Sequence, residues 1–528
     1  MPKGVSIQAY ADDLLLIVSG HSRATLESNA KEAIQRIKSW SEHYKLTFNP
    51  AKMTAMTIKR QGSFKGSRTP TIKWDNDSIP SVESFRYLGV VWDSNLTFSP
   101  HMDGVRNTVL DMSQKLMRTA RRLYSNHPAL LKKIYMGAIE RYALFGSGAW
   151  GPRLCNSKFR ERLNSIQRPF ALLISKAYKS VPTLSAQVLA GVLPLDLAAT
   201  KEFAKFQMRT RDTLVSVASA TFDPNDYEES VDLWPVHPAT RISIPYSLNK
   251  PCGDEMEIYT DGSGLEGRVG AAFVVLYYGA EIHEERYRLG DLNTVFQAEL
   301  FAIKKALEWC VQNRKGKYTS IHTDSLSSLY AMTNSSHRHF LVNGIKDLYR
   351  QALTSQTVEF KWIKAHVGHH GNELADDRAK RATLKEEVDF SLPIPMARFT
   401  RKLKDLLLRE WQTRWESSDK GRQTFHFISK VSTKVLYGNH YINQVLTGHG
   451  RFPHYLARVG LGSSEECACG SGNGDALHYL LECDLTQATR DKLRFDRGNL
   501  GSLLTDFNLP HLEQLAREVG GFVEQLVR

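Results

Sequence analysis

The stretch YTDGSG, residues 259–264, places an acidic side chain at the end of a run with the alternation of a β-strand. Three further stretches carry an acidic residue beside a predicted element: FQAELFA (296–302), HTDSLSS (322–328) and NELADDRA (372–379). We expect Asp261 and Asp324 to end strands, Glu299 to lie in the first turn of a helix, and Asp376 to begin a helix. The predicted order around these acids is therefore strand, helix, strand, helix.

The predicted positions of the four acids favour a metal site. The strand ends of an α/β sheet are where such folds bind ligands, so carboxylates there would lie close together despite their mutual repulsion. Oxygen ligands favour Mg²⁺ or Mn²⁺, and two such ions can activate a water and stabilise the leaving oxygen of a phosphodiester. A single acid at a strand end more often caps a turn or a helix. Four acids in this order and context favour catalysis instead.

The sequence around these acids alternates strand and helix patterns. The predicted strands cover 257–260, 269–277, 319–323 and 358–365, and the predicted helices cover 295–312 and the residues from 371 onward. This mixture predicts an α/β domain with a mixed sheet, closed by Pro393 and Pro395.

The order TDGS, AEL, TDS and then H-x-G-H-x-G-N-E-x-A-D resembles the ribonuclease H family over about residues 254–386. The resemblance implies a ribonuclease H-like mixed sheet with flanking helices. It also implies that Asp261, Glu299, Asp324 and Asp376 bind two Mg²⁺ or Mn²⁺ ions. The family cuts the RNA strand of RNA/DNA hybrids and leaves a 3′-hydroxyl and a 5′-phosphate.

The same resemblance implies roles for residues around the carboxylates. His366 matches a mobile histidine that assists proton transfer and product release, and an imidazole suits that work because its unperturbed pKa lies near neutrality. By itself it would be an ordinary loop histidine. Contacts to 2′-hydroxyl and phosphate groups of a hybrid are expected from Gly262, Ser263, Gln297 and Asn372.

The amino-terminal part contains YADD, residues 10–13, between two apolar runs. We expect a strand, a turn at the Asp pair and a second strand over residues 8–18, followed by a helix over 25–44, a strand over 53–58 and a helix over 105–123. YADD with KMTAMTIK (52–59), FRYLGVVWDSNLTFSPHM (85–102) and IYMGAIERYALFGSGAWGP (134–152) resembles the palm and thumb of non-LTR retrotransposon reverse transcriptases.

A polymerase of that family needs a third carboxylate from an earlier strand, and residues 1–11 contain no acidic residue. Asp12 and Asp13 are therefore interpreted as the remnant of a truncated polymerase site, and this chain alone is not expected to extend a primer. A partner chain that supplies the missing carboxylate is the alternative.

The positive charge of the chain is concentrated in one region. The 528 residues carry a formal net charge of +13, and residues 101–211 alone contain 19 Lys and Arg against 6 Asp and Glu. Such a region favours a polyanion, RNA or DNA, as partner, although a single charged helix face can be merely solvated. The longest apolar runs, such as 269–278, are far shorter than the roughly 20 residues of a membrane span, and no signal peptide opens the chain. We expect an intracellular protein, with nuclear action implied by the resemblance.

Three of the six cysteines are clustered near the carboxyl end, while Cys155, Cys252 and Cys310 are scattered. Cys467, Cys469, His478 and Cys483 offer three thiolates and one imidazole, a suitable set for tetrahedral Zn²⁺. The Cys-x-Cys pair is tighter than usual, and reduced cysteines without metal are the alternative. HYLLEC (478–483) resembles the carboxy-terminal knuckle of the same retrotransposon family, which would contact nucleic acid.

The chain is thus interpreted as the carboxy-terminal part of a non-LTR retrotransposon polyprotein. We expect five segments: a partial palm (1–100), a basic helical thumb (101–222), a proline-containing linker (223–253), a ribonuclease H domain (254–386) and a mostly helical region with a zinc knuckle (387–528). The expected activity is hydrolysis of RNA in hybrids. A nucleic-acid-binding relic without catalysis is the main alternative.

Overall fold

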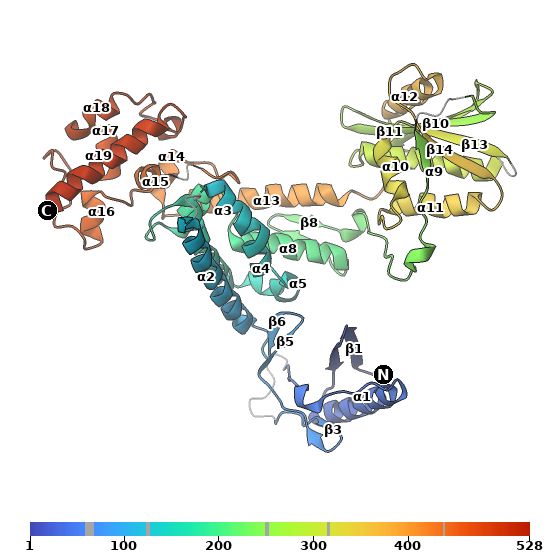
Figure 1. Cartoon of the computed structure of the whole chain (residues 1–528), viewed down its shortest axis with the longest axis horizontal. Coiled ribbons are helices and arrows are strands. Elements are labelled where there is room, and N and C mark those ends of the chain that lie inside the picture. The colour runs from blue at the N-terminus through green and yellow to red at the C-terminus, as the bar shows by residue number, and fades with distance from the viewer. Residues whose placement is uncertain (59–67, 123–126, 249–252, 314–316, 437–438, 528) are drawn as a thin grey trace. The chain divides into compact units, whose positions relative to one another are not determined.

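The computed structural model describes residues 1–58, 68–122, 127–248, 253–313, 317–436 and 439–527 (Figure 1). The described chain forms two compact units: residues 204–406 make one, and residues 1–203 together with 407–528 make the other. Cys252 and Leu123 lie outside the described residues. No single helix in the described ranges is long and apolar enough to cross a membrane. Only α7 (Thr183–Ala190) with α8 (Leu195–Thr210), bent by 67° at their break, together reach that length and composition.

The unit of residues 204–406 is built on a six-stranded sheet in the order β12-β11-β10-β13-β14-β9. Strands β10, β11 and β12 are antiparallel neighbours, whereas β13, β14 and β9 continue the sheet in parallel from β10. The strands are β9 Tyr246–Leu248, β10 Met256–Leu265, β11 Arg268–Tyr277, β12 Ala280–Leu289, β13 Tyr318–Thr323 and β14 Thr357–Trp362. The predicted mixed sheet is confirmed.

Helices cover both faces of this sheet because the side chains of a strand alternate between its faces. Phe273 and Val275 of β11 lie in the main core with residues of α9 (Val295–Asn313) and α11 (Phe340–Ala352). Val274 of the same strand packs instead in a small cluster with Ala375 of α12 (His370–Thr383). The remaining elements of this unit are α10 Leu326–Thr333 and the hairpin β7 Val215–Val217 with β8 Ala220–Phe222. Helix α13 (Met396–Ser417) begins in it.

Two features of this unit differ from the prediction. Strand β12 was not expected, because its sequence AEIHEERYRL is too polar to look like a core strand. The stretch 223–253 is not merely a linker, because β9 pairs with β14 and Ile244 is buried in the main core. Apolar periodicity cannot reveal a three-residue edge strand.

The amino-terminal residues form the predicted hairpin and helix. Strand β1 (Val5–Tyr10) pairs with β2 (Asp13–Val18), and α1 (Arg23–His43) follows behind an N-cap at Ser22. The predicted strand over 53–58 is wrong, because this stretch forms only one isolated bridge, from Ala55 to Ser81. Short hairpins follow: β3 Lys73–Trp74 with β4 Asp77–Ser78, and β5 Ser84–Tyr87 with β6 Val90–Asp93.

The basic region is helical, as predicted. Val105 and Val109 of α2 (Ser99–Arg122) are buried, whereas Arg106 and Lys115 are exposed on its other side. The further helices are α3 Pro128–Ile134, a π-helical turn Tyr135–Ile139, α4 Glu140–Ala143, α5 Ser147–Trp150 and α6 Ser157–Ser175. Together with α7 and α8 they enclose one apolar core.

The carboxy-terminal residues complete this same unit. After α13 come α14 Arg422–Phe427, α15 His440–Thr447, α16 Pro453–Arg458, α17 Ala476–Leu481, α18 Gln487–Arg490 and α19 Leu509–Val527. Leu436 donates its amide to Leu189 O at 3.0 Å, and Lys132 Nζ donates to Gly191 O at 2.7 Å and also to Thr433 O. We call the contact between residues 175–191 and 433–455 the seam.

Candidate active site

Three of the four predicted carboxylates converge at one end of the sheet. Strands β10 and β13 are paired up to Thr260 and Thr323, so the next residues, Asp261 and Asp324, are neighbours. Glu299 reaches them from the second turn of α9. One carboxylate oxygen from each of Asp261, Glu299 and Asp324 lies within 4.8 Å of the other two. The structure therefore brings together side chains that are up to 63 positions apart, counting from Asp261 to Asp324.

The approach of α9 to β10 depends on a glycine. A Cβ atom added to Gly262 would lie 2.5 Å from the backbone nitrogen of Glu299, closer than real contacts allow. Only a residue without a side chain lets the two backbones come this close. The Gly262 backbone also forms hydrogen bonds that favour the charged forms of Asp261 and Glu299.

Burial and mutual repulsion nevertheless disfavour those charges. Burial, followed by the charges of Asp324 and Asp376, raises the pKa of Asp261 to about 7. Burial, followed by Asp261 and Asp324, raises the pKa of Glu299 well above its ordinary value. Glu299 Oε2 is buried and has no hydrogen-bond partner. An orphaned oxygen among crowded carboxylates fits a bound cation, which would supply the missing partner and offset the repulsion.

Asp376 is placed differently from the other three acids. It lies in the second turn of α12 rather than at its start, and its carboxylate accepts a hydrogen bond from Lys380 Nζ at 2.7 Å. Its charge contributes to the raised pKa of Asp261, so it lies near the cluster without joining the close group of three. The i,i+4 spacing of Asp376 and Lys380 was a sequence signal for this pair.

His366 lies in the exposed loop before α12. Its backbone has φ +55°, in the left-handed region that few residues other than glycine adopt. Asn372, at the start of α12, donates from Nδ2 to Asp324 Oδ2 at 3.2 Å, while its Oδ1 is buried without a partner. Ser263 follows Gly262 in β10 and is half-buried. His366 is thus exposed to solvent, whereas Asn372 is fixed against a carboxylate.

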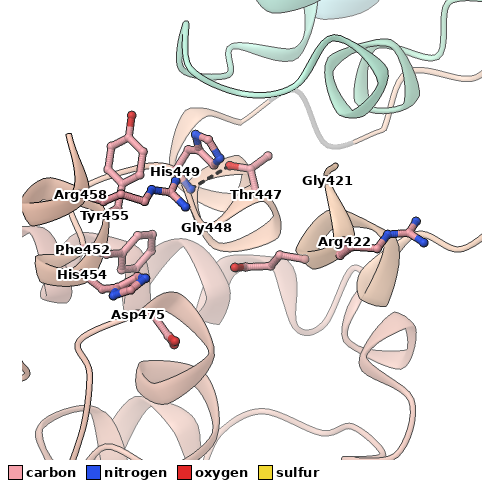
Figure 2. Close-up of a pocket in the computed structure, with 11 residues that line it drawn as sticks. Gly421, Arg422, Thr447, Gly448, His449, Phe452, His454, Tyr455, Arg458 and Asp475 are labelled. Carbon is pink, nitrogen blue, oxygen red and sulfur yellow. Dashed lines mark hydrogen bonds between the residues drawn. The ribbon is translucent and has the colours of Figure 1, made fainter. Parts of the chain in front are cut away.

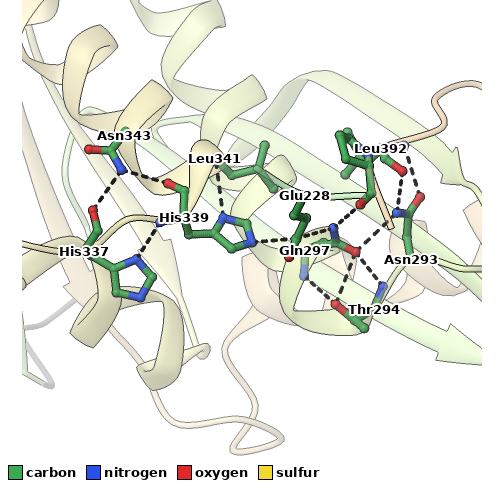
Figure 3. A network of polar contacts seen from close by, with 10 residues as sticks. Glu228, Asn293, Thr294, Gln297, His337, His339, Leu341, Asn343 and Leu392 are labelled. Carbon is green, nitrogen blue, oxygen red and sulfur yellow. Dashed lines mark hydrogen bonds and ion pairs between the residues drawn. The ribbon is translucent and has the colours of Figure 1, made fainter. Parts of the chain in front are cut away.

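Gln297 does not lie in the site, and the prediction that its side chain binds substrate is wrong. It is buried, and Nε2 donates to Glu228 Oε1 at 2.7 Å and to Pro393 O at 2.9 Å (Figure 3). Its Oε1 accepts hydrogen bonds from Asn293 and Thr294. All polar atoms of Gln297 are therefore engaged inside the protein.

One supporting residue of the site was not predicted. The indole Nε1 of Trp362, at the end of β14, donates to the backbone carbonyl of Asp324 at 3.1 Å. This bond ties the turn that carries Asp324 to the neighbouring strand. Nothing in the sequence pairs a tryptophan with a residue 38 positions earlier.

The cysteine cluster is also assembled. Ligand atoms of Cys467, Cys469, His478 and Cys483 all lie within 4.8 Å of one another. The sulfurs of Cys467 and Cys483 are 3.6 Å apart, and Cys469 Sγ is 3.3 Å from His478 Nε2. Hydrogen bonds from Ser471 lower the pKa of Cys469 to about 6, whereas burial raises the pKa of Cys483 to about 12.

The Asp pair of the YADD stretch lies on an exposed turn. Ala11, with φ +49°, and Asp12 connect β1 to β2, and Asp13 opens β2. Neither carboxylate belongs to a group of three or more ligand-type side chains among the described residues.

Two family models match parts of the chain. Residues 253–384 match the model described as RNase H, and residues 1–92 match the model described as reverse transcriptase (RNA-dependent DNA polymerase). The chain therefore carries a ribonuclease H domain and a reverse transcriptase segment.

The curated relatives are retrotransposon proteins. The chain is 31% identical over 203 residues to a 115 kDa protein in the type-1 retrotransposable element R1DM of Drosophila melanogaster, covering 38% of this chain and 20% of that protein. It is 28% identical over 198 residues to a retrovirus-related Pol polyprotein from element R1 of Nasonia vitripennis, covering 37% of this chain and 59% of that protein. A third, from R1 of Popillia japonica, is 26% identical over 247 residues, covering 46% of this chain and 97% of that protein.

The chain thus spans about a fifth to three fifths of the length of the first two relatives. With its two family matches, it fits part of a non-LTR retrotransposon polyprotein. The resemblance stated from the sequence is confirmed.

Proposed function

We propose that this chain hydrolyses the RNA strand of RNA/DNA hybrids, leaving a 3′-hydroxyl and a 5′-phosphate. The observation that carries the proposal is the close group of buried Asp261, buried Glu299 and half-buried Asp324, with its orphaned Glu299 oxygen. The match to the RNase H family over residues 253–384 supports the choice of substrate. The buried carboxylates also favour an active enzyme over a relic that only binds nucleic acid.

The four carboxylates would hold two Mg²⁺ or Mn²⁺ ions. When bound, two such ions activate a water and stabilise the leaving oxygen of a phosphodiester. Asn372 and Trp362 hold Asp324 through its side chain and its carbonyl, respectively. Lys380 offsets the negative charge of Asp376. His366, exposed in a loop ahead of α12, would move protons at the scissile phosphate and assist product release.

The test is cleavage of a labelled RNA/DNA hybrid by the purified chain with Mg²⁺. We expect the hybrid RNA to be cut, with single-stranded RNA and duplex RNA left intact. Asp261→Asn should reduce the rate by about 10²–10³-fold, the usual loss when a charge-stabilising group leaves an active site. Asp347→Asn is the matched control, because Asp347 is exposed and pairs only with Arg350. A hybrid that is bound but not cut would contradict the proposal.

We propose that the chain alone does not extend a primer. Asp12 and Asp13 are exposed, and no third ligand-type side chain joins them among the described residues. Primer extension on a primed RNA template at ordinary enzyme concentrations would overturn this expectation.

We also infer that Cys467, Cys469, His478 and Cys483 hold one Zn²⁺. Three sulfurs and an imidazole nitrogen suit tetrahedral zinc. Glu482 Oε2 lies 3.7 Å from His478 Nδ1, where a carboxylate orients a ligating imidazole.

A further inference from the structure

A polar pocket of about 230 Å³ lies in the carboxy-terminal residues, and none of the residues that line it belongs to the two ligand clusters described above (Figure 2). Its walls come from the start of α14, the end of α15, helix α16 and the residue that caps α17. The residues that matter for its chemistry are Gly448, His449, His454, Tyr455, Arg458 and Asp475. They span fewer than 30 positions, so the pocket is formed by consecutive helices of one region.

Arg458 lines the pocket and has no carboxylate within ion-pair distance among the described residues. Its guanidinium forms no hydrogen bond or ion pair with another described residue and lies 5.5 Å from the centre of the Tyr455 ring. Figure 2 shows it directed from α16 toward the turn at Thr447 and His449. Arg422 also lines the pocket, but it is turned away and donates to the carbonyls of Trp415 and Glu416. Only one arginine therefore faces the pocket with unused donors.

The positive charge of Arg458 affects the neighbouring histidine, His449. Burial and then the Arg458 charge lower the pKa of His449 to about 4, so its ring is neutral near pH 7. His449 Nδ1 lies 3.0 Å from Ser180 Oγ, which also bonds the Tyr455 hydroxyl across the seam. The His449 and Tyr455 rings are 5.0 Å apart. This wall of the pocket is thus held in place before any ligand arrives.

The two nearby carboxylates are already engaged. Asp475 Oδ1 accepts the backbone amide of His478 at 2.8 Å, as the N-cap of α17. Glu465 Oε2 lies 3.3 Å from His454 Nδ1. The backbone turn at Gly448 has φ +69°, and a Cβ there would lie 2.2 Å from Gln423 Oε1, so glycine is required where the pocket wall bends.

We propose that this pocket binds a phosphate group of a nucleic-acid backbone, with Arg458 as the charged donor. A planar guanidinium with free N–H groups matches phosphate oxygens in a two-pronged contact. Neutral polar groups such as His449 can complete the hydrogen bonds, and the competing charge of Asp475, which also lines the pocket, is partly offset by the His478 backbone amide that it accepts. The source of the phosphate is an RNA or DNA strand, because the unit that contains the pocket also contains residues 101–203, with 16 Lys and Arg against 6 Asp and Glu. The site is separate from the hydrolase and does not depend on its activity.

The test compares Arg458→Gln with Arg497→Gln in the full chain. Arg497 is an exposed arginine of the same region outside the pocket, so it controls for the loss of one positive charge. Fluorescence anisotropy with a labelled single-stranded RNA should show about tenfold weaker binding for Arg458→Gln, the effect of one lost charged hydrogen-bonding contact. The slope of log affinity against log salt should fall by about 1 for that variant. The RNA affinity of Arg458→Lys should lie between those of Arg458→Gln and Arg497→Gln, because lysine keeps the positive charge but loses the two-pronged contact of the guanidinium.

Several outcomes would overturn the proposal. Equal RNA binding by the two glutamine variants would show that the pocket takes no phosphate of the strand. Competition by inorganic phosphate or AMP at the pocket, with RNA affinity unchanged in Arg458→Gln, would identify a free phosphate as the ligand instead. In an Asp261→Asn background, which stops hybrid cleavage, Arg458→Gln should weaken single-stranded RNA binding by the same factor, so failure of this site and failure of the hydrolase can be told apart.

Discussion

At the scale of single residues, the candidate active site is a set of crowded carboxylates, two of them buried, that are held together against repulsion. Glu299 is the most constrained, because its Oε2 has no partner and its pKa is raised by burial, Asp261 and Asp324. Such a group costs folding free energy unless a cation is bound. Under the proposed function, Glu299 would contribute to cation binding and not to stability.

Glu299→Gln should therefore separate stability from metal binding. We expect the metal-free variant to exchange its backbone amides in β10 and α9 more slowly than the unmodified chain, because one buried charge is gone. Added Mg²⁺ should protect the unmodified chain and leave the variant unchanged. Hydrogen exchange with mass spectrometry measures both effects. Glu308→Gln, more than two turns after Glu299 in the same helix and with Lys305 Nζ 2.8 Å from its carboxylate, should behave like the unmodified chain, and loss of Mg²⁺ protection there would argue against the assignment.

Residue types and their order were enough to predict that Asp261, Glu299 and Asp324 converge, although two of the expected positions were wrong: β10 continues past Asp261 to Leu265, and Glu299 lies in the second turn of α9. Residue types and their order did not predict the position of the Gln297 side chain. Consecutive positions of an α-helix turn by about 100°, so a residue two positions from Glu299 points to a different side of the helix. Its partner Glu228 is 69 positions earlier, and no pattern in the sequence relates the two.

At the scale of elements, the site depends on how closely β10 and α9 approach. Gly262→Ala would place a methyl group 2.5 Å from the Glu299 nitrogen, and the backbone there cannot yield as a side chain can. We expect a loss of about 1–3 kcal/mol in the opening free energy of the β10 amides, as for other overpacked cores.

Gly344→Ala is the matched control for that change. It lies in α11 of the same unit, and its added Cβ would be 3.6 Å from Lys304 Cε, an ordinary contact. Alanine in a helix should stabilise it by up to about 1 kcal/mol. Equal effects of the two substitutions would show that the close approach of β10 to α9 does not matter.

The cysteine cluster includes a residue of the short helix α17. Helix α17 carries His478 and is followed at once by Cys483. We expect one zinc per chain when the protein is purified without chelator, and faster amide exchange over residues 465–485 when a chelator removes it. Elemental analysis and hydrogen exchange check these two outcomes. Protein that is free of zinc and equally protected would remove the assignment, whereas Cys155→Ser should leave the zinc content unchanged because Cys155 lies outside the cluster.

Edge elements were the hardest to predict from the sequence. Strand β12 carries five charged residues and one histidine among its ten residues, which is typical of an edge strand that is protected from pairing further. Strand β9 is only three residues long. Central strands such as β11 are apolar on both faces and were therefore recognised.

At the scale of the whole molecule, the unit that contains the basic helices is made from two separate stretches of sequence. The seam joins them through the backbone hydrogen bond from Leu436 to Leu189, through side-chain hydrogen bonds and through Gly191, where φ is +61° and an added Cβ would lie 1.9 Å from Lys434 O. Contacts across 200 or more positions leave no local signature, so the seam could not be predicted.

Gly191→Ala should open the seam. We expect limited proteolysis of the full chain to cut faster within residues 429–436, because the strained alanine pushes Lys434 away. Gly104→Ala in α2, where an added Cβ meets nothing within 4 Å, should leave the cleavage rate unchanged. Equal rates for the two variants would contradict the role assigned to Gly191.

The divided unit has a consequence for synthesis on the ribosome. Residues 1–203 emerge first, but residues 407–528, which pack against them, follow only after the 203 residues of the ribonuclease H unit. At about 5–20 residues per second, this delay is on the order of 10–40 s. During that interval the ribonuclease H unit, which is continuous in sequence, can fold while the nascent basic helices still lack their partner. Chaperones that shield apolar surface should therefore associate with the nascent chain mainly before residue 436 has left the exit tunnel.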